Sequence, residues 1–279
     1  MMDGKICLVT GATSGIGSAA AVELARMGAT VIIGARNEAK AEKARRRIGE
    51  LSESDDLHTA IADLSLQSEV RRLGGELEMR FPRIDVLINN AAGVFFRRQT
   101  TSEGIEKTWA TNHLSYFLLT SLLMPALERS EAGRIVNVSS SAHKRGEIYF
   151  DDVELKEGYS WRKAYGQSKL ANLLFSYELS RNLKGKNITV NALHPGWVAT
   201  EIGQNFWLAR ITAPLIFRSA KTPEQGAETV VHLASAKEIE GVTGKFFIDK
   251  VETESAAHSH DRESAKRLWA ISETMTRER

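Results

Sequence analysis

The segment Thr10-Gly11-Ala12-Thr13-Ser14-Gly15-Ile16-Gly17 joins a short β-rich run, Ile6–Thr10, to an alanine-rich run with helical periodicity, Ile16–Met27. Glycines let a backbone turn sharply and approach a pyrophosphate, whose charge is met by free N–H groups and the positive end of the helix dipole. The spacing is G-x-x-x-G-x-G rather than G-x-G-x-x-G, and such a turn can also be purely structural. If the turn binds phosphate, the residues that we expect to take part are Gly11, Thr13, Ser14, Gly15, Ile16 and Gly17.

Short apolar runs alternate with helical patterns along the rest of the chain, which is typical of strands buried on both faces of a parallel sheet. We therefore predict an α/β fold, a single doubly wound (Rossmann-type) domain over residues 1–279 with a seven-stranded parallel sheet flanked by helices. The predicted strands are Ile6–Thr10, Thr30–Ala35, Leu57–Ala62, Val86–Asn89, Arg134–Val138, Ile188–Leu193 and Lys245–Ile248. The predicted helices are Ile16–Met27, Glu38–Leu51, Ser68–Arg80, Gly104–Glu128, Ala164–Leu183 and Pro223–Ala234.

Two connections are longer than the others. Residues 141–164 form an insertion after the fifth predicted strand, and residues 197–222 form an apolar and aromatic excursion after the sixth. Long loops in compact domains are often functional lids. The second segment is thus either a lid over an apolar substrate or a helix pair packed on the core or on another subunit.

Composition excludes several classes of protein. The chain of 279 residues is 42% hydrophobic with a net charge of +2, so it is neither disordered nor charged enough to hold nucleic acid. The single cysteine, Cys7, excludes an internal disulfide framework and disfavours a metal site. The most apolar stretch, Leu114–Leu127, is too short to span a bilayer. We expect no metal, no membrane span and a cytoplasmic location.

The end of the second predicted strand indicates which cofactor is bound. Arg36 follows this strand, two residues before Glu38. At this position an Asp or Glu binds the ribose hydroxyl of NAD, whereas an Arg accommodates a 2′-phosphate. Arg36 therefore favours NADP(H), with Ser14 as a second phosphate donor. The alternative is a solvated Arg36, with Glu38 as the acidic partner of NAD(H).

The third and fourth predicted strands also end in polar residues at the carboxyl edge, where such sheets bind ligands. Asp63 equally fits a second role, as a cap of the following helix. The candidate cofactor contacts at this edge are Asp63, Leu64, Asn90 and Ala91.

Tyr165 and Lys169 are four residues apart in a predicted helix, so their side chains lie on one face, one turn apart. A free tyrosine, with a pKa of ~10, is a poor acid–base group at neutral pH, but a nearby ammonium favours its phenolate. We therefore expect Lys169 to lower the pKa of Tyr165. Ser140, at the end of the fifth strand, can hydrogen-bond a substrate oxygen and stabilise charge that develops there.

A second pair, Tyr159 and Lys163, has the same spacing. Tyr165 is followed by an apolar helical stripe that fixes it to the core, whereas Tyr159 lies in a polar stretch. Because catalytic groups on rigid elements are better positioned, we choose Tyr165.

Several of these motifs stand in a fixed order: Thr10–Gly17, Asn89–Ala91, Asn112–Leu114, Val138–Ser140, Tyr165–Asn172 and Asn191–Gly196. Together they resemble the short-chain dehydrogenases/reductases, and within them the retinol dehydrogenase-like branch, over nearly the whole chain. One departure is Ala92, where the family usually has glycine.

The resemblance implies a role for each matching residue. Tyr165 is implied to be the general acid/base and Lys169 to contact the ribose and modify the pKa of the tyrosine. Ser140 is implied to orient the carbonyl, and Asn112 to hold a water in a proton relay. The implied contacts of the nicotinamide are Pro195, Gly196, Val198 and Thr200.

We expect an NADP(H)-dependent oxidoreductase, with NAD(H) as the other possible cofactor, that moves hydride between the nicotinamide and an apolar carbonyl or alcohol substrate. The alternatives are a non-catalytic NADP(H) sensor, which would not need the acid–base residues, and an epimerase or dehydratase, which would need a larger substrate domain. The resemblance also implies a homodimer or homotetramer assembled through the helices Gly104–Glu128 and Ala164–Leu183.

Overall fold

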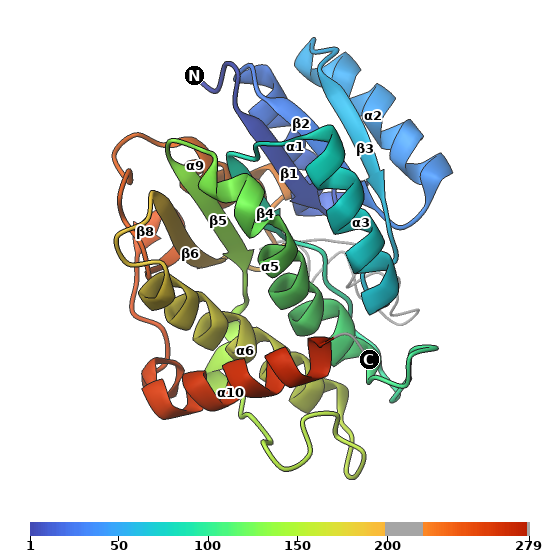
Figure 1. Ribbon diagram of the computed structural model, residues 1–279, viewed down its shortest axis with the longest axis vertical. Helices are drawn as coiled ribbons and strands as arrows, with labels where there is room; N and C mark the ends of the chain where they lie inside the picture. Colours follow the sequence, from blue (N-terminus) through green and yellow to red (C-terminus); the bar gives the residue numbers. More distant parts are fainter. Residues whose placement is uncertain (199–219, 278–279) are drawn as a thin grey trace.

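The computed structural model describes residues 1–198 and 220–277. The strands are β1 (Ile6–Thr10), β2 (Thr30–Ala35), β3 (Leu57–Ile61), β4 (Val86–Asn89), β5 (Gly133–Val138), β6 (Ile188–His194), β7 (Phe246–Ile248) and β8 (Val251–Glu252). They form one sheet in the order β3-β2-β1-β4-β5-β6-β7-β8 (Figure 1). The strand order reverses between β1 and β4, and in doubly wound sheets ligands bind at the carboxyl ends of the strands beside this point.

The first seven strands are parallel, as the sequence predicts, but the sheet has an eighth strand that the sequence analysis did not predict. β8 has only two residues and pairs with β7 in the antiparallel direction. Asp249 and Lys250 form the tight turn between them, both with positive φ. A strand of two residues is too short to produce an alternating pattern, which is the usual signal of a strand.

Helices cover both faces of the sheet. They are α1 (Gly15–Arg26), α2 (Glu38–Ser52), α3 (Gln67–Arg80), α4 (Lys107–Trp109), α5 (Ser115–Glu128), α6 (Trp161–Asn182), α9 (Pro223–Ser235) and α10 (Arg262–Thr276). One core contains Cys7 and Val9 of β1 with residues of α1, α2 and α9. The other contains Leu8 with residues of α3, α5 and α6. Neighbouring β1 residues thus face opposite helix layers, as expected for a strand buried on both sides.

The single cysteine lies in the first of these cores. Cys7 is fully buried in β1, and burial raises the pKa of its thiol well above the ordinary value. A buried thiol in apolar surroundings stays protonated and unreactive.

The predicted helix Gly104–Glu128 is wrong at its start and interrupted in its middle. Gly104 lies in a turn with a φ of 83°, and the helical path begins at α4, where the buried Glu106 side chain caps the backbone N–H groups of Thr108 and Trp109. A π-helical turn, η1 (Ala110–Leu114), then separates α4 from α5. Single π turns inside helices are frequent at functional sites.

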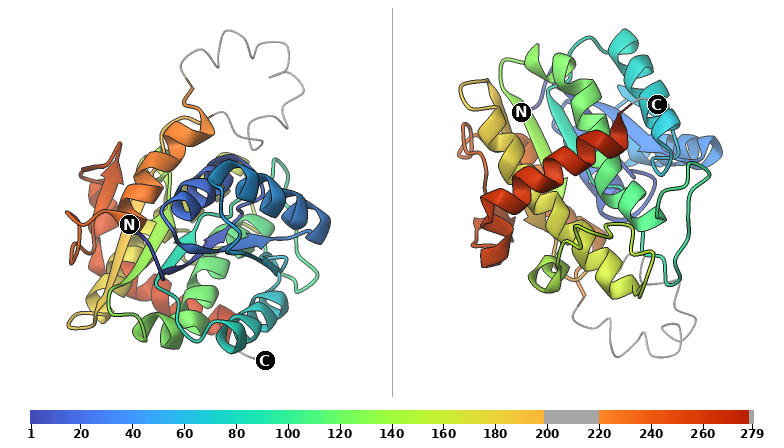
Figure 2. Two further views of the ribbon diagram at one scale, coloured as in Figure 1. Left: turned by 90° about the horizontal axis from the view of Figure 1, so that it is seen from above. Right: turned by 60° about the horizontal axis from the view of Figure 1, so that its bottom comes forward.

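The helix α10 was missed by the sequence analysis. Asp261 caps its first turn, and Ala265 and Leu268 pack against α6. Figure 2 shows α10 crossing α5 and α6, and Trp269 contacts the rings of Phe117 and Phe175 from these helices. The signal was present in the sequence, because an Asp cap precedes apolar residues at helical spacing.

The described part of the excursion at 197–222 consists of its two ends. Lys221 donates a backbone hydrogen bond to Trp197 and pairs with Val198 in a short parallel bridge. Thr222 and Gln225 then form a capping box at the start of α9. The rest of the predicted lid, residues 199–219, lies outside the described residues.

Within the described residues, no helix is both long enough and apolar enough to cross a membrane. The insertion at 141–164 consists of a 3-10 turn, η2 (Ser141–Arg145), a loop and the first residues of α6.

Candidate active site

The turn after β1 has the shape that the glycine spacing predicts. Gly11 and Gly15 have φ values of 66° and 57°, which side chains other than glycine rarely adopt. A Cβ on Gly17 would lie 2.5 Å from the Gly11 carbonyl oxygen and 2.6 Å from Asn90 Nδ2. The first turn of α1 therefore packs directly on the loop, with Ser14 at its N-cap position. Backbone N–H groups at such a helix start form a cradle for phosphate.

The end of β4 braces this cradle. The Asn90 side chain donates to the carbonyl oxygens of Thr10 and Gly11, at 2.8 and 3.3 Å. Thr10 Oγ1 in turn accepts from the backbone N–H groups of Asn90 and Ala91, at 2.8 and 3.0 Å. These bonds join the carboxyl ends of β1 and β4, between which the strand order reverses. The part of Thr10 in them was not predicted from the sequence.

Arg36 is exposed after β2, and among the described residues its guanidinium has no hydrogen-bond or ion-pair partner. Asn37 beside it caps α2 by accepting from the Lys40 N–H at 2.9 Å. β2 is the direct neighbour of β1 in the sheet. Arg36 is thus placed at the edge that holds the glycine turn, with its charge free for a ligand.

Asp63 serves local structure after β3. Its Oδ1 accepts from the N–H and the hydroxyl of Ser65, at 3.0 and 2.7 Å, and α3 begins only at Gln67. Asp63 thus stabilises the turn before α3 and does not cap the helix itself, whose N-cap residue is Leu66. Leu64 packs partly buried against the core. The role of Asp63 and Leu64 in cofactor binding stays a prediction.

The segment after β6 returns toward the glycine turn. Val198 fits against α1 and α9, because a Cβ on Gly226 would meet Val198 Cγ2 at 2.6 Å and Ile16 at 3.2 Å. Pro195 and Gly196 precede it at the carboxyl end of β6. The structure thus brings Val198 close to Ile16, while Thr200 lies outside the described residues.

Ser140, Tyr165 and Lys169 come together at the carboxyl end of β5. The Ser140 hydroxyl lies beside that of Tyr165, close enough to lower the pKa of the tyrosine, and accepts from the Ala142 N–H at 3.2 Å. Lys169 is buried, 1% exposed, with Nζ donating to the Val138 carbonyl oxygen at 2.9 Å. The Lys169 Nζ lies 5.7 Å from the centre of the Tyr165 ring. Tyr165 as a whole residue is partly exposed, at the carboxyl edge of the sheet.

Burial is the largest influence on both titratable groups. It raises the pKa of Tyr165 above the ordinary value, while the hydrogen bond with Ser140 acts in the opposite direction. Burial also lowers the pKa of Lys169 to about 7. From the spacing of the two residues we expect the Lys169 ammonium to lower the pKa of Tyr165. In the structure desolvation outweighs this effect, because Lys169 Nζ is turned to Val138 and has lost much of its own preference for the charged form.

Asn112 lies in the π turn η1 and is fully buried. Its Oδ1 accepts from the Gly93 N–H at 2.8 Å, and its Nδ2 donates to the Gly93 carbonyl at 2.9 Å and to Ser168 Oγ at 3.2 Å. The side chain thus ties the loop after β4 to α6, next to Lys169. The water-holding role implied by the resemblance stays a prediction.

The competing tyrosine is engaged elsewhere. Tyr159 precedes α6, and its hydroxyl donates to the Phe95 carbonyl at 2.6 Å. Lys163 is directed over the ring of Tyr149. Tyr159 therefore anchors a loop, and the choice of Tyr165 as the acid/base stays a prediction.

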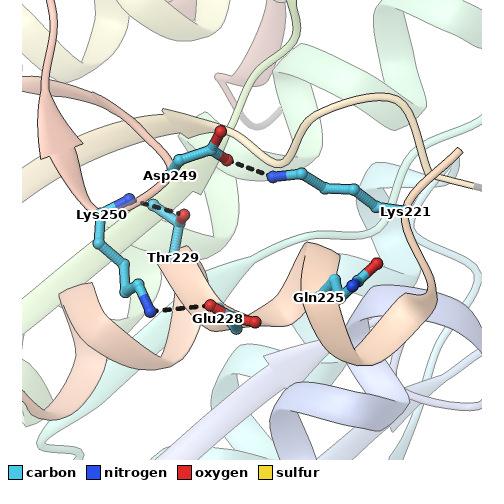
Figure 3. Close-up of a pocket in the computed structure, with 6 residues that line it drawn as sticks. All are labelled: Lys221, Gln225, Glu228, Thr229, Asp249 and Lys250. Carbon is cyan, nitrogen blue, oxygen red and sulfur yellow. Dashed lines mark hydrogen bonds and ion pairs between the residues drawn. The ribbon is translucent and has the colours of Figure 1, made fainter. Parts of the chain in front are cut away.

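A separate pocket lies between α9 and the β7–β8 turn (Figure 3). Its charged side chains pair across it, Lys221 with Asp249 and Lys250 with Glu228. None of the predicted catalytic residues lines it, so we place the active site at the carboxyl end of β5 instead.

Residues 5–210 match the family profile described as short chain dehydrogenase. The chain belongs to the short-chain dehydrogenase family. Its relatives within the family include the human Retinol dehydrogenase 14, which is 42% identical, with 99% of this chain and 87% of the relative covered. The human Polyprenol dehydrogenase is 35% identical, with 98% of this chain and 85% of the relative covered.

Solved structures of short-chain dehydrogenases and related proteins have the same fold. An uncharacterised protein from Mycobacterium Paratuberculosis superposes with a TM-score of 0.80 at 33% identity, covering 99% of this chain and 94% of its own. The Pseudomonas aeruginosa RhlG/NADP active-site complex has a TM-score of 0.71 at 30% identity, covering 88% and 94%. This short-chain dehydrogenase is accordingly an oxidoreductase that acts on CH–OH groups with a nicotinamide dinucleotide.

Proposed function

We propose that the protein is an NADP(H)-dependent oxidoreductase that interconverts an apolar aldehyde or ketone, similar to retinal, and its alcohol. The observation that carries this proposal is the placement of Tyr165, a partly exposed residue, beside the Ser140 hydroxyl and one helical turn from the buried Lys169. A redox sensor would not need this set of groups. We therefore favour the enzyme over the sensor.

Tyr165 is the general acid/base in this proposal. Because burial raises its pKa, the hydroxyl is protonated at neutral pH and can give its proton to a carbonyl oxygen. Ser140 holds the same oxygen by a hydrogen bond as charge develops on it. The nicotinamide supplies or accepts the hydride.

Lys169 supports the tyrosine after proton transfer. Its Nζ is close enough for a positive charge there to favour the phenolate, 5.7 Å from the ring centre. A pKa of about 7 means that this charge can be gained or lost near neutral pH. Proton uptake by Lys169 would thus accompany charge development on Tyr165.

The glycine turn and Arg36 would hold the cofactor. The cradle fits a dinucleotide, because the backbone N–H groups at the start of α1 are those that bind phosphate in such folds. The glycine turn packs so closely on α1 that a Cβ on Gly17 would collide with the loop. The exposed guanidinium of Arg36 supports a preference for the 2′-phosphate of NADP(H). A solved relative that is an NADP complex adds further support.

Aromatic side chains at the same edge support an apolar substrate. Trp161 lies one helical turn before Tyr165 on α6 and packs edge-on against Phe96, with ring centres 5.6 Å apart. Trp197 is 65% exposed at the start of the excursion after β6. The names Retinol dehydrogenase and Polyprenol dehydrogenase of two relatives point to substrates of this kind.

The test is loss of nicotinamide absorbance with NADPH and NADH in parallel, against a panel of aldehydes and ketones that includes retinal and short polar controls. We expect turnover with the apolar aldehydes and a preference for NADPH. Turnover with NADH alone would refute the cofactor assignment. Tight NADPH binding without any turnover would favour the sensor.

A further inference from the structure

His143 lies behind Ser140, in a turn that no sequence motif marks. It is fully buried in η2, three residues after Ser140. Its ring Nδ1 lies 2.6 Å from the Ser140 carbonyl oxygen, and its backbone N–H reaches the same oxygen at 3.1 Å. The ring and the backbone N–H of His143 thus both donate to the carbonyl oxygen of Ser140, the residue proposed to bind the substrate.

The partners of the ring determine its protonation. A carbonyl oxygen can only accept, so Nδ1 carries the hydrogen. The other nitrogen, Nε2, accepts from the backbone N–H of Ala256 at 3.2 Å and so has no hydrogen. Burial lowers the pKa of His143, which agrees with this neutral form.

A C-terminal segment holds the ring from the far side. This segment, Ser255–His260, lies 113 residues along the chain from His143 yet contacts it twice, through Ala256 N–H and through His258 Nε2, which donates to the His143 carbonyl at 3.1 Å. Phe246 of β7 meets the ring edge-on, with ring centres 5.2 Å apart.

The C-terminal segment is itself anchored on α6. Ser255 Oγ lies 2.6 Å from the Tyr177 hydroxyl and 3.0 Å from His260 Nε2, and the Tyr177 and His260 rings stack at 4.8 Å. Because α6 also carries Tyr165, the C-terminal segment contacts the helix of Tyr165 on one side and, through His143, the turn of Ser140 on the other.

We propose that His143 is a positioning residue that fixes the Ser140 turn for catalysis, and that the C-terminal segment Ser255–His260 sets the orientation of its ring. The proposal rests on the function proposed above. With the carbonyl of Ser140 held by two donors, the turn that aims its hydroxyl at Tyr165 has little freedom. Removing the ring donor would let this turn relax.

Two substitutions separate the two ring contacts. The amide of His143→Asn occupies the place of Nδ1 and can still donate to Ser140, but it cannot reach Ala256. The amide oxygen of His143→Gln occupies the place of Nε2 and can still accept from Ala256, but the donor to Ser140 is lost. Each variant removes one of the two ring hydrogen bonds, so both should lower the melting temperature by a similar amount.

Three measurements are made on both variants and on the wild type: kcat and KM with NADPH and an apolar aldehyde, the melting temperature, and hydrogen exchange of the amides of Ala142 and His143, which bond to Ser140. We expect His143→Gln to lose roughly 10- to 100-fold in kcat with little change in the KM for NADPH. Its two amides should exchange faster. His143→Asn should retain kcat within about threefold, because the contact with Ser140 remains.

Equal kcat in the two variants, falling only in proportion to their melting temperatures, would show a merely structural role and overturn the proposal. If the backbone amides at positions 142 and 143 exchange in His143→Gln at the same rate as in the wild type, the proposal is overturned as well. If the wild type turns over no substrate in the panel, the proposed function fails. The exchange measurement then still decides whether His143 holds the Ser140 turn.

Discussion

At the scale of single residues, the two candidate tyrosines differ in what lies beside their hydroxyl groups. Tyr159 and Tyr165 have the same spacing to a lysine, but the Tyr159 hydroxyl donates to a backbone carbonyl, whereas that of Tyr165 lies beside Ser140. The choice of Tyr165 as the acid/base rests on its position on a packed helix and stays a prediction. The contacts of Tyr159 were not readable, because they involve Phe95, far away along the chain.

Tyr165→Phe should lower turnover roughly 10²- to 10⁴-fold, because the substrate loses its proton donor and acceptor. Affinity for NADPH should change little. The matched control is Tyr159→Phe, which removes the hydroxyl from the competing tyrosine and should keep turnover. Steady-state kinetics and cofactor titration check both variants, and a fully active Tyr165→Phe would contradict the assignment.

Arg36→Glu should move cofactor preference from NADPH toward NADH by roughly 10- to 100-fold, since one charge-assisted contact is replaced by repulsion. Lys43→Glu is the control, because Lys43 is exposed on the adjacent α2 and carries the same charge. The ratio of kcat/KM for the two cofactors is the measurement. A similar shift in both variants would mean that general charge, rather than Arg36, sets the preference.

The lowered pKa of Lys169 predicts that the free energy of unfolding of the cofactor-free protein depends on pH. Its pKa falls from the ordinary 10.5 to about 7 on folding, so between these values the unfolded chain binds more protons than the folded one. The contribution of Lys169 to the free energy of unfolding therefore rises with pH across this window. Urea unfolding at pH 6.5 and pH 9 should show a rise that Lys169→Met lacks and that the exposed Lys163→Met retains. An identical rise in Lys169→Met would contradict the low pKa.

Other residue roles could be predicted only in part. Asp63 was open between a cofactor contact and a cap, and its side chain is bonded to Ser65. Asn112 was placed in the active site by resemblance, yet its contacts with Gly93 and Ser168 depend on a π turn that no sequence pattern marks. The pKa of Lys169 depends on burial by distant segments, which spacing along the chain does not show.

At the scale of elements, periodicity found every long strand and the helices α1, α2, α3, α6 and α9 to within a few residues. It did so because continuous apolar runs and apolar stripes are local signals. β8 was too short to detect. The break between α4 and α5 was missed because the apolar stripe continues through the π turn.

The glycine turn allows a paired test of packing. Gly17→Ala should destabilise the protein by about 1–3 kcal/mol and weaken cofactor binding, because the new methyl group would collide with Gly11 and Asn90. Gly75→Ala, in α3, meets nothing within 4 Å and should stabilise by about 0.5–1 kcal/mol. Chemical unfolding and NADPH titration measure the two effects. Unchanged NADPH affinity in Gly17→Ala would show that the turn does not hold the cofactor.

At the scale of the whole molecule, α10 bears on assembly. The resemblance implies subunit contacts through the helices Gly104–Glu128 and Ala164–Leu183. In the structure, α6 is buried along Gly166–Tyr177, and α10 lies across it and α5. Along Gly166–Tyr177, α6 therefore exposes no residue to a partner, although α5 still exposes Ser121 and Pro125.

We therefore predict that any oligomer of this chain uses another surface. Light scattering across a range of concentrations gives the oligomeric state. Hydrogen exchange of α6 should not depend on concentration if the prediction is correct. Protection of α6 that increases with assembly would show instead that α10 moves aside.

The buried cysteine can report on unfolding of the chain. Because Cys7 lies in the central strand β1 and its thiol is protonated there, a thiol-reactive dye should not label the native protein. The rate of labelling then measures how often the middle of the sheet opens. For the same reason, a cysteine introduced on the surface would be the only site that a fluorescent probe modifies, and no background cysteine need be removed first.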